Sequence, residues 1–132
     1  PPESEDFTTN ENLFNYQAMV IKQIAAEGPC VIVGRCADYV LRDDPAVVRI
    51  FIYADEEHCV KNAADVKGIT DRREALKAIA SIDRERAAYY KAHTGREWID
   101  ARNYDLCLNS GALGFDKCVD MINDFIHVKL GK

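Results

Sequence analysis

The stretch PCVIVGRCADYVL, which runs from Pro29 to Leu41, decides how the fold is predicted. Its four apolar residues, Cys30–Val33, predict a buried β-strand that leads directly into Gly34 and Arg35. A plain turn at that point would use a pair such as Asn-Gly. The arginine instead places a permanent cation at the end of a buried strand. We therefore interpret Arg35 as a candidate ligand-binding residue.

Strands and helices alternate along the rest of the chain. Two further strands are predicted at Val47–Ala54 and Tyr104–Asn109, and helices are predicted from a Thr8–Glu11 capping box to Gly28, over 37–41, from about 55 to 67, from 71 to about 91 and over 115–129. The strand at 47–54 is almost continuously apolar, as is typical of strands covered on both faces. The pattern predicts an α/β domain with a parallel sheet. Ligands bind beyond the carboxyl ends of such strands, where Arg35 is expected.

Length and composition limit the classes of function. With 132 residues, 48% of them hydrophobic, residues 1–132 predict a single domain whose first ten residues are polar and loose. The net charge of −5 argues against binding of nucleic-acid polymers, although a local arginine cluster can still bind a small anion. No apolar run approaches the length of a membrane span.

Cysteine and histidine usage gives no sign of a disulfide or a metal site. The cysteine count is odd, no CxxC pair occurs, and Cys30 and Cys107 lie in apolar runs where they are expected to be buried. The three histidines share no metal-ligand spacing. These features predict a cytoplasmic protein with reduced thiols.

The stretch SIDRERAAYY, from Ser81 to Tyr90, is the second candidate site. Arg84 and Arg86 lie two residues apart, so an ideal helix places them on different faces. Near a fraying helix end both would reach one polyanion, and the planar fork of arginine suits phosphate. The alternative is a solvated helix face with ion pairs such as Asp83 with Arg86, each worth roughly a few tenths of a kcal/mol. The loop 93–98 that follows would act as a moving flap.

Four blocks of the sequence, VIVGRCADYVL, VVRIFIYADEE, IDRERAAYY and YDLCLNSGALG, follow the order found in the cytidylate kinases. From about Asn12 to Ile126 the chain resembles the cytidylate kinase-like branch of bacterial proteins. The resemblance implies an α/β fold in three layers, the P-loop kinase-like parallel sheet with flanking helices. It also implies a nucleoside monophosphate kinase that moves the γ-phosphoryl group of ATP, with Mg²⁺, to a CMP-like acceptor.

The resemblance also implies roles for particular residues. Arg35 matches the arginine that binds the acceptor, and Asp38, three residues on, would help to bind the substrate, although Asp38 alone also fits as a cap of the short helix near Tyr39. Asp83, Arg84 and Arg86 match a lid motif, here within about 71–98. Asp83 would help to bind the substrate. The two arginines would be catalytic, because they close over the phosphates and neutralise the charge of the transferring group.

The end of the third predicted strand matches the loop that lies beside the adenine of ATP. The residues concerned are Asn109, Ser110 and Leu113. No magnesium ligand is implied, because the usual hydroxyl belongs to a loop that these residues do not contain.

Three departures separate the sequence from the family pattern. The family motif Gly-Arg-Asp becomes Gly-Arg-Cys at Cys36, and the helix that follows the second strand carries Cys59 and Asn62 where arginines are usual. The third departure is the absence of any G-x-x-x-x-G-K-[ST] loop, which in the family follows a strand in the middle of the sheet. A sheet without that strand leaves two rows of backbone groups unpaired.

We therefore expect these residues to be the later part of a longer polypeptide, inactive alone and with a reason to form a homo-oligomer. Two alternatives remain beside the kinase hypothesis. The chain would be a non-catalytic nucleotide-binding or regulatory module, or a plain α/β interaction domain whose arginines form surface ion pairs.

Overall fold

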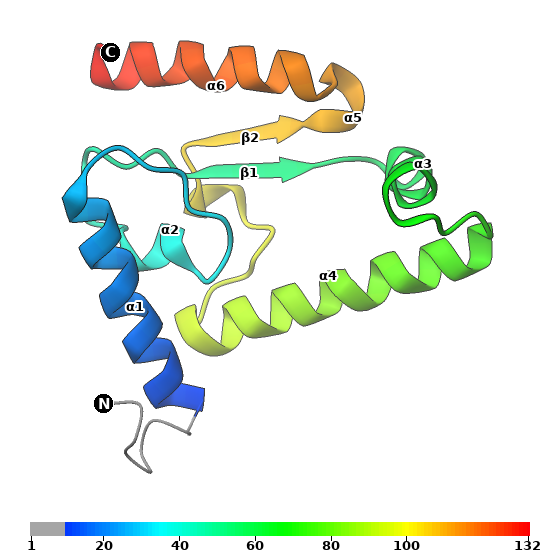
Figure 1. The fold of residues 1–132 in the computed structure, drawn as a ribbon, viewed down its shortest axis with the longest axis horizontal. Coiled ribbons are helices and arrows are strands. Elements are labelled where there is room, and N and C mark those ends of the chain that lie inside the picture. The colour runs from blue at the N-terminus through cyan, green and yellow to red at the C-terminus, as the bar shows by residue number, and fades with distance from the viewer. Residues whose placement is uncertain (1–9) are drawn as a thin grey trace.

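The computed structural model describes residues 10–132, whose arrangement is shown in Figure 1. Most of this part of the chain is helical, with helices α1 (Asn10–Glu27), α2 (Ala37–Val40), α3 (Glu56–Lys67), α4 (Arg72–Thr94), α5 (Ser110–Leu113) and α6 (Phe115–Leu130), a 3-10 helix η2 (Ala101–Asn103), and strands β1 (Ile50–Tyr53) and β2 (Leu106–Asn109). The predicted Thr8 cap and most of the predicted loose segment lie outside the described residues.

The two strands form a parallel sheet in which Ile50 lies beside Leu106 and Tyr53 beside Asn109. The connection between them contains α3 and α4, which return the chain from the end of β1 to the start of β2. Figure 1 shows α6 along the β2 side of the sheet and α4 on the opposite side, beyond β1. The predicted α/β organisation with a parallel sheet is confirmed, although each strand is only four residues long.

One predicted strand is wrong for the described chain. Residues Cys30–Val33 form no strand, and the side chains of Val31 and Val33 are 92% and 88% exposed. Cys30 is exposed as well. Apolarity alone does not make a strand, because its backbone groups need a neighbouring strand to pair with. Within residues 10–132 the sheet contains only β1 and β2, so one edge of β1 is also free.

Most helix ends lie where polar side chains and glycines predict them. The side chains of Asp55 and Asp71 each accept a hydrogen bond from the backbone N–H three residues on, which starts α3 and α4. Gly68 ends α3 in the left-handed region, with φ 70°. α4 runs beyond its predicted end to Thr94, whose hydroxyl donates to the Tyr90 carbonyl at 2.7 Å.

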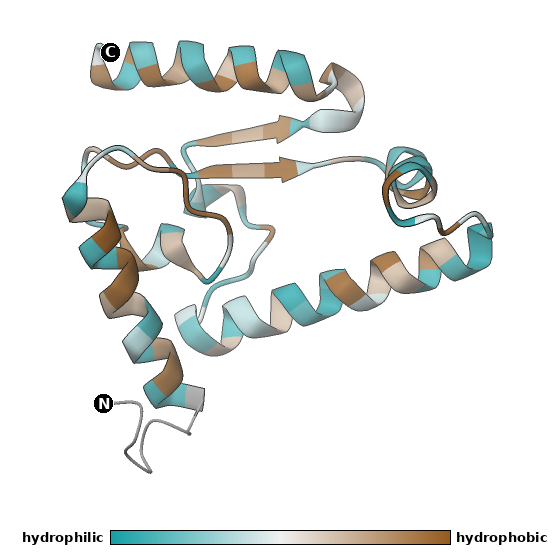
Figure 2. Cartoon of the chain, in the orientation of Figure 1, coloured by the Kyte–Doolittle hydropathy of each residue, from teal (hydrophilic) through white to brown (hydrophobic). Residues whose placement is uncertain are grey.

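The core of the described chain is thin. Its buried apolar residues are mostly small: Ile21, Cys36, Ala37, Ala63, Ala75, Tyr90, Leu108 and Cys118. Large apolar side chains stay exposed, including Met19 on α1 and Phe115 and Val128 on α6. Figure 2 shows apolar residues along α1, α6 and both strands. So much exposed apolar surface is typical of a face that further protein covers. All five cysteines are free thiols.

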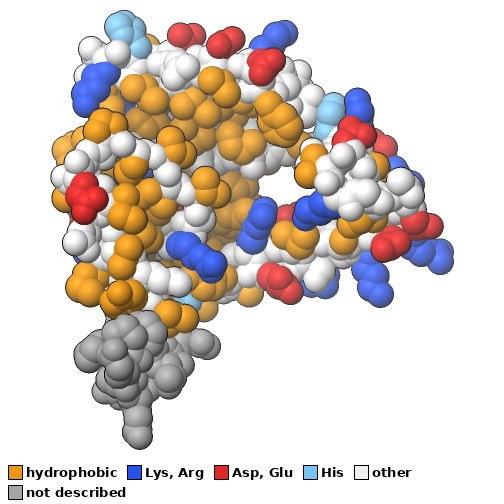
Figure 3. All heavy atoms as spheres, viewed as in Figure 1, with side chains coloured by type: hydrophobic (Ala, Val, Ile, Leu, Met, Phe, Trp, Pro, Cys, Tyr) orange, Lys and Arg blue, Asp and Glu red, His pale blue; other side chains and the backbone are white. Residues whose placement is uncertain are grey.

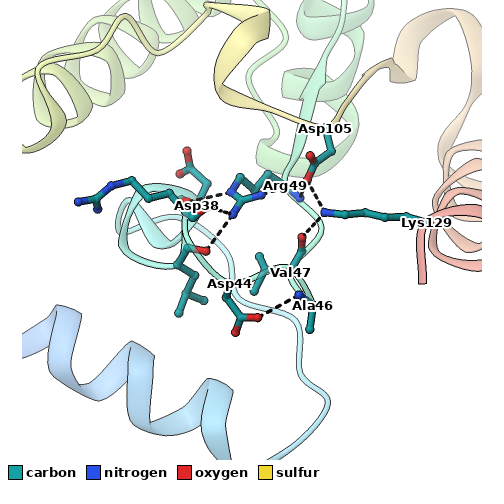
Figure 4. A network of polar contacts seen from close by, with 9 residues as sticks. Asp38, Asp44, Ala46, Val47, Arg49, Asp105 and Lys129 are labelled. Atoms are coloured by element: carbon teal, nitrogen blue, oxygen red, sulfur yellow. Dashed lines mark hydrogen bonds and ion pairs between the residues drawn. The ribbon is translucent and has the colours of Figure 1, made fainter. Parts of the chain in front are cut away.

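A polar network centred on Arg49 joins α2 to the strands and to α6 (Figure 4). The guanidinium of Arg49 donates to three backbone carbonyls, that of Asp38 within α2 and those of Leu41 and Arg42 just after it. It also pairs with the Asp105 carboxylate at 3.4 Å. Lys129 of α6 reaches the same carboxylate at 3.4 Å. Arg49 thereby fixes the position of α2.

Candidate functional site

Arg35 lies in a turn between the exposed segment 30–33 and α2. Gly34, Arg35 and Cys36 all have positive φ, at 74°, 57° and 57°. A non-glycine residue in this region costs roughly 1–2 kcal/mol, so the surrounding structure must impose this turn. The Arg35 side chain is exposed and forms no hydrogen bond or ion pair with any described residue. The turn thus presents a free guanidinium immediately before α2.

Arg84 and Arg86 lie in the middle of α4 and not at a fraying end. The helix continues through Thr94, so the two guanidiniums point to different sides of a regular helix. Both side chains are exposed, and neither pairs with a carboxylate in the part of the chain that the structure describes. The alternative ion pair between Asp83 and Arg86 is therefore not formed. The prediction of a fraying end is wrong, because α4 is longer than its sequence pattern indicated.

One contact between α2 and α4 shows which arginine of α4 lies on the helix face that meets α2. The Tyr90 hydroxyl donates to the Asp38 carboxylate at 2.8 Å, and Tyr90 is only 4% exposed. Residues four apart lie on one face of a helix, so Arg86 is on the same face of α4 as Tyr90. Asp83, seven residues before Tyr90, shares that face, whereas Arg84 does not. Arg86 and Asp83 therefore share the α4 face that contacts α2 through Tyr90, with Asp83 about two turns nearer the start of the helix than Tyr90.

Asp38 does not cap α2, contrary to one of its two interpretations. The N-terminal cap of α2 is Cys36, which makes no side-chain capping bond, and Asp38 lies inside the first turn. The Asp38 carboxylate is instead committed to Tyr90. Burial, followed by the hydrogen bond to Asp38, raises the pKa of the Tyr90 hydroxyl well above its ordinary value. The hydroxyl is therefore a stable donor throughout the physiological pH range.

The predicted adenine-side residues shape the carboxyl edge of the sheet. The Asn109 side chain accepts hydrogen bonds from the backbone N–H groups of Gly111 and Ala112, at 3.1 and 3.2 Å, and so starts α5. The Ser110 hydroxyl donates to the Tyr53 carbonyl at 3.1 Å and ties the two strand ends together. Leu113, the last residue of α5, is half-buried.

His58 is a neighbour of this edge that the sequence did not predict. A Cβ placed on Gly111 would lie 2.8 Å from Cγ of the His58 ring, so only glycine fits against the ring without a shift. The His58 ring also contacts the Asp55 carboxylate at 2.6 Å. The sequence signal was a glycine two residues after a strand end, which by itself does not identify its partner.

Figure 3 shows an open hollow between the sheet and α4. Hydrophobic side chains line its inner part, and Lys and Arg side chains project into it from the α4 side. Ile52 and Tyr53 at the end of β1 are 44% and 46% exposed. A space with an apolar wall and cationic side chains suits a ligand that joins an aromatic or apolar body to anionic groups.

A further concavity of about 500 Å³ lies at loop 95–103, and neither Arg35 nor Arg86 is among its lining residues. Four of its five charged side chains are paired, Lys91 with Glu97 and Arg102 with Asp100, and the fifth, Arg96, lies over the Tyr39 ring. We assign no ligand to it. In residues 10–132 no group of three His, Cys, Asp or Glu side chains is placed to hold a metal ion, and no helix is long and apolar enough to cross a membrane.

Comparison with known proteins gives a family and a similar structure. Residues 2–112 match the sequence model of the family described as the cytidylate kinase-like family. The crystal structure of an uncharacterized protein from Eubacterium ventriosum ATCC 27560 is similar, with a TM-score of 0.85 and 30% sequence identity. The similarity covers 92% of this chain and 69% of that chain. No curated protein matches.

Proposed function

This chain belongs to the cytidylate kinase-like family, and we propose that in its complete form the protein is a nucleoside monophosphate kinase that uses ATP, Mg²⁺ and a CMP-like acceptor. The observation that carries the proposal is that two arginines without an ion pair in the described chain, Arg35 and Arg86, lie three and four residues from the two partners of the contact between Asp38 and Tyr90. Arginines without a carboxylate partner are available to bind phosphate. The alternative, in which these arginines serve only in surface ion pairs, is less well supported, because neither arginine forms such a pair in the described chain.

The proposed reaction is an in-line phosphoryl transfer. An oxygen of the acceptor phosphate attacks the γ-phosphorus of ATP, and the bond from that phosphorus to the bridging oxygen of ADP breaks. A monophosphate thereby becomes a diphosphate, and ADP leaves. Charge is spread over the oxygens of the transferring group, so positioned cations supply most of the catalysis. Arg86 and Arg84 are proposed for this role, and Arg35 and Asp83 for holding the acceptor.

The reaction also requires a loop that holds the phosphates of ATP, and no G-x-x-x-x-G-K-[ST] sequence occurs in the 132 residues. We propose that in the complete three-layer fold a further strand lies between segment 30–33 and β1 and carries this loop. The exposure of Val31 and Val33, together with the free edge of β1, supports that place for it. Bound Mg²⁺ would neutralise charge on the ATP phosphates.

The proposal is tested by supplying the complete protein with ATP, Mg²⁺ and, one at a time, the common nucleoside monophosphates. We expect ADP release to depend on both Mg²⁺ and the acceptor, with CMP among the accepted monophosphates. The control omits the acceptor, which separates transfer from plain ATP hydrolysis. A protein that binds nucleotides but transfers nothing to any acceptor would contradict the kinase.

That outcome would favour a non-catalytic nucleotide-binding module, which one observation on α3 supports. Cys59 and Asn62 stand where the family usually carries arginines, and the Cys59 thiol turns inward to donate to the Ala54 carbonyl at 3.7 Å. Neither residue can neutralise a phosphate, because neither carries a positive charge. α3 therefore contributes fewer cations to the hollow than the family pattern would.

Replacing Arg35 with alanine is expected to raise the KM for the acceptor by about 10- to 100-fold while the KM for ATP stays within about twofold. A hydrogen bond to a charged group contributes roughly 1.5–3 kcal/mol, which corresponds to this range. Steady-state kinetics of the complete protein give both constants. Arg102→Ala, which removes an exposed cation paired with Asp100, is the matched control. An unchanged KM for the acceptor would exclude Arg35 from acceptor binding.

A further inference from the structure

The contact between α2 and α4 joins segments that are distant in the sequence, and each segment carries an arginine without an ion pair in the described chain, Arg35 before α2 and Arg86 within α4. Tyr90 is buried, and its hydroxyl bonds a carboxylate 52 residues away. A second contact supports the first, because the Tyr39 ring lies 4.9 Å from the Arg96 guanidinium just beyond α4. α2 is therefore held against the last turns of α4 and the loop that follows it.

Each partner of this hydrogen bond lies within four residues of an arginine that forms no ion pair in the described chain. Arg35 precedes Asp38 by three residues, and Arg86 precedes Tyr90 by four residues, which is about one helical turn on the same face. Arg49 fixes the other end of α2 through the carbonyls of Asp38, Leu41 and Arg42. The spacing between the two cations is therefore set by how α2 sits against α4.

One oxygen of the Asp38 carboxylate, Oδ2, accepts the hydrogen bond from Tyr90. We propose that Asp38 and Tyr90 are positioning residues, which hold Arg35 and Arg86 at a fixed spacing so that both guanidiniums engage one phosphate-bearing acceptor. This inference rests on the proposed function. It reassigns Asp38, which the sequence had suggested as a substrate-binding residue, to a role exerted through Arg35.

The hydrogen bond has a second consequence for Arg35. As long as Tyr90 donates to Asp38, that carboxylate has a partner of its own. Without the hydroxyl, an unpartnered carboxylate would lie three residues from a free guanidinium and would compete with the acceptor for it. Tyr90→Phe should therefore weaken acceptor binding in two ways, by loosening α2 and by neutralising Arg35.

The test compares Tyr90→Phe with Tyr89→Phe in the complete protein. The Tyr89 hydroxyl donates to Gln17 of α1 at 3.3 Å, so the control removes a hydroxyl from the next residue without touching α2. We expect Tyr90→Phe to raise the KM for the acceptor about tenfold, with the KM for ATP within about twofold and a Tm close to that of the control. The double variant Asp38→Asn/Tyr90→Phe removes the competing charge and should show an intermediate KM.

An unchanged KM for the acceptor in Tyr90→Phe would overturn the inference. So would a parallel rise of both KM values with a lowered Tm, because that result indicates a structural role only. Calorimetric titration of the same variants with CMP separates this inference from the proposed function. A parent that binds CMP but transfers nothing would contradict the kinase, and the Kd values of the variants would then decide the positioning role. A parent that does not bind CMP would contradict both.

Discussion

Replacing Arg86 with alanine is expected to lower the kcat of the complete protein by about 100- to 1,000-fold, because one preorganised donor to a developing charge is worth this much in other enzymes. The stability should hardly change. The Arg86 side chain is exposed and makes no ion pair in the described chain, and surface substitutions of this kind usually lie within about 0.5 kcal/mol. A large loss of turnover in a fully folded protein is therefore the expected signature.

Lys77→Ala is the matched control, since Lys77 is an exposed cation on the same helix. It lies 13 residues before Tyr90, a spacing that places it on the opposite side of α4. Arg86→Lys keeps the charge but loses the planar fork, so it should recover only part of the activity. Measurement of kcat at saturating ATP and acceptor, together with Tm, gives the comparison. Equal turnover in Arg86→Ala and the parent would remove Arg86 from the catalytic site.

Arg84→Ala is also expected to lower kcat, but this effect requires that phosphate reaches a second face of α4. Arg84 lies off the face that Arg86 shares with Tyr90. If Arg84 acts as proposed, it contacts phosphate from another side of α4 than Arg86 does. A loss in Arg86→Ala without a loss in Arg84→Ala would show that the reactive phosphate approaches one face of the helix only.

Replacing Arg49 with alanine is expected to lower the free energy of unfolding by about 2–4 kcal/mol. The Arg49 side chain is only 13% exposed and satisfies three carbonyls as well as the Asp105 carboxylate. Its removal takes this donor from the Asp38 and Arg42 carbonyls, and losing a partly buried donor is more costly than losing an exposed pair. The Leu41 carbonyl keeps the Asp44 N–H, and the Asp105 carboxylate keeps Lys129. Arg102→Ala, which removes a side chain that is 90% exposed, should leave the free energy of unfolding close to that of the parent.

Urea unfolding of the complete protein provides the measurement. The Arg49→Ala curve should move to a clearly lower midpoint with an unchanged slope. If it superimposed on the Arg102→Ala curve, the network in Figure 4 would not hold α2 in place.

The same network predicts a loss of stability in acid. Burial acts to raise the pKa of the Asp105 carboxyl, but the backbone N–H of Arg49 and the Lys129 ammonium outweigh it and hold the pKa below the ordinary 3.8. A carboxyl with a lowered pKa in the folded state stabilises the fold above its unfolded pKa, and this stability is lost as the pH falls through the folded value. We expect Asp105→Asn to reduce stability at pH 7 and to flatten its decline below about pH 4. An acid profile identical to that of the parent would contradict this role of Asp105.

The sequence predicted elements that depend on local patterns and failed where a distant partner decides. Asp55 and Asp71 identified helix starts because a capping bond spans only three residues. The strand predicted at Cys30–Val33 is wrong, because a strand needs a neighbouring strand to pair with, and an apolar sequence does not supply one. α4 was predicted too short for a similar reason. Its last turn depends on the Thr94 hydroxyl and on packing against α1 and α2.

In the candidate site, too, local features could be predicted from the sequence and contacts between distant residues could not. Helical periodicity showed correctly that Arg84 and Arg86 lie on different faces, but it gave no means of deciding which of them shares the face of α4 that meets α2. That decision comes from the hydrogen bond between Tyr90 and Asp38, whose partners no local pattern connects. The contact of His58 with Gly111 was missed because it joins the starts of two helices across the strand ends.

The most direct test of the kinase proposal follows the γ-phosphoryl group itself. The complete protein is given ATP labelled at the γ-phosphate, CMP and Mg²⁺, and the labelled products are separated. The proposal predicts that label moves into CDP, that removal of Mg²⁺ stops the transfer, and that Arg35→Ala and Arg86→Ala both slow it severely. Label found only in ATP or in inorganic phosphate, whichever monophosphate replaces CMP, would contradict the assignment of this protein as a nucleoside monophosphate kinase.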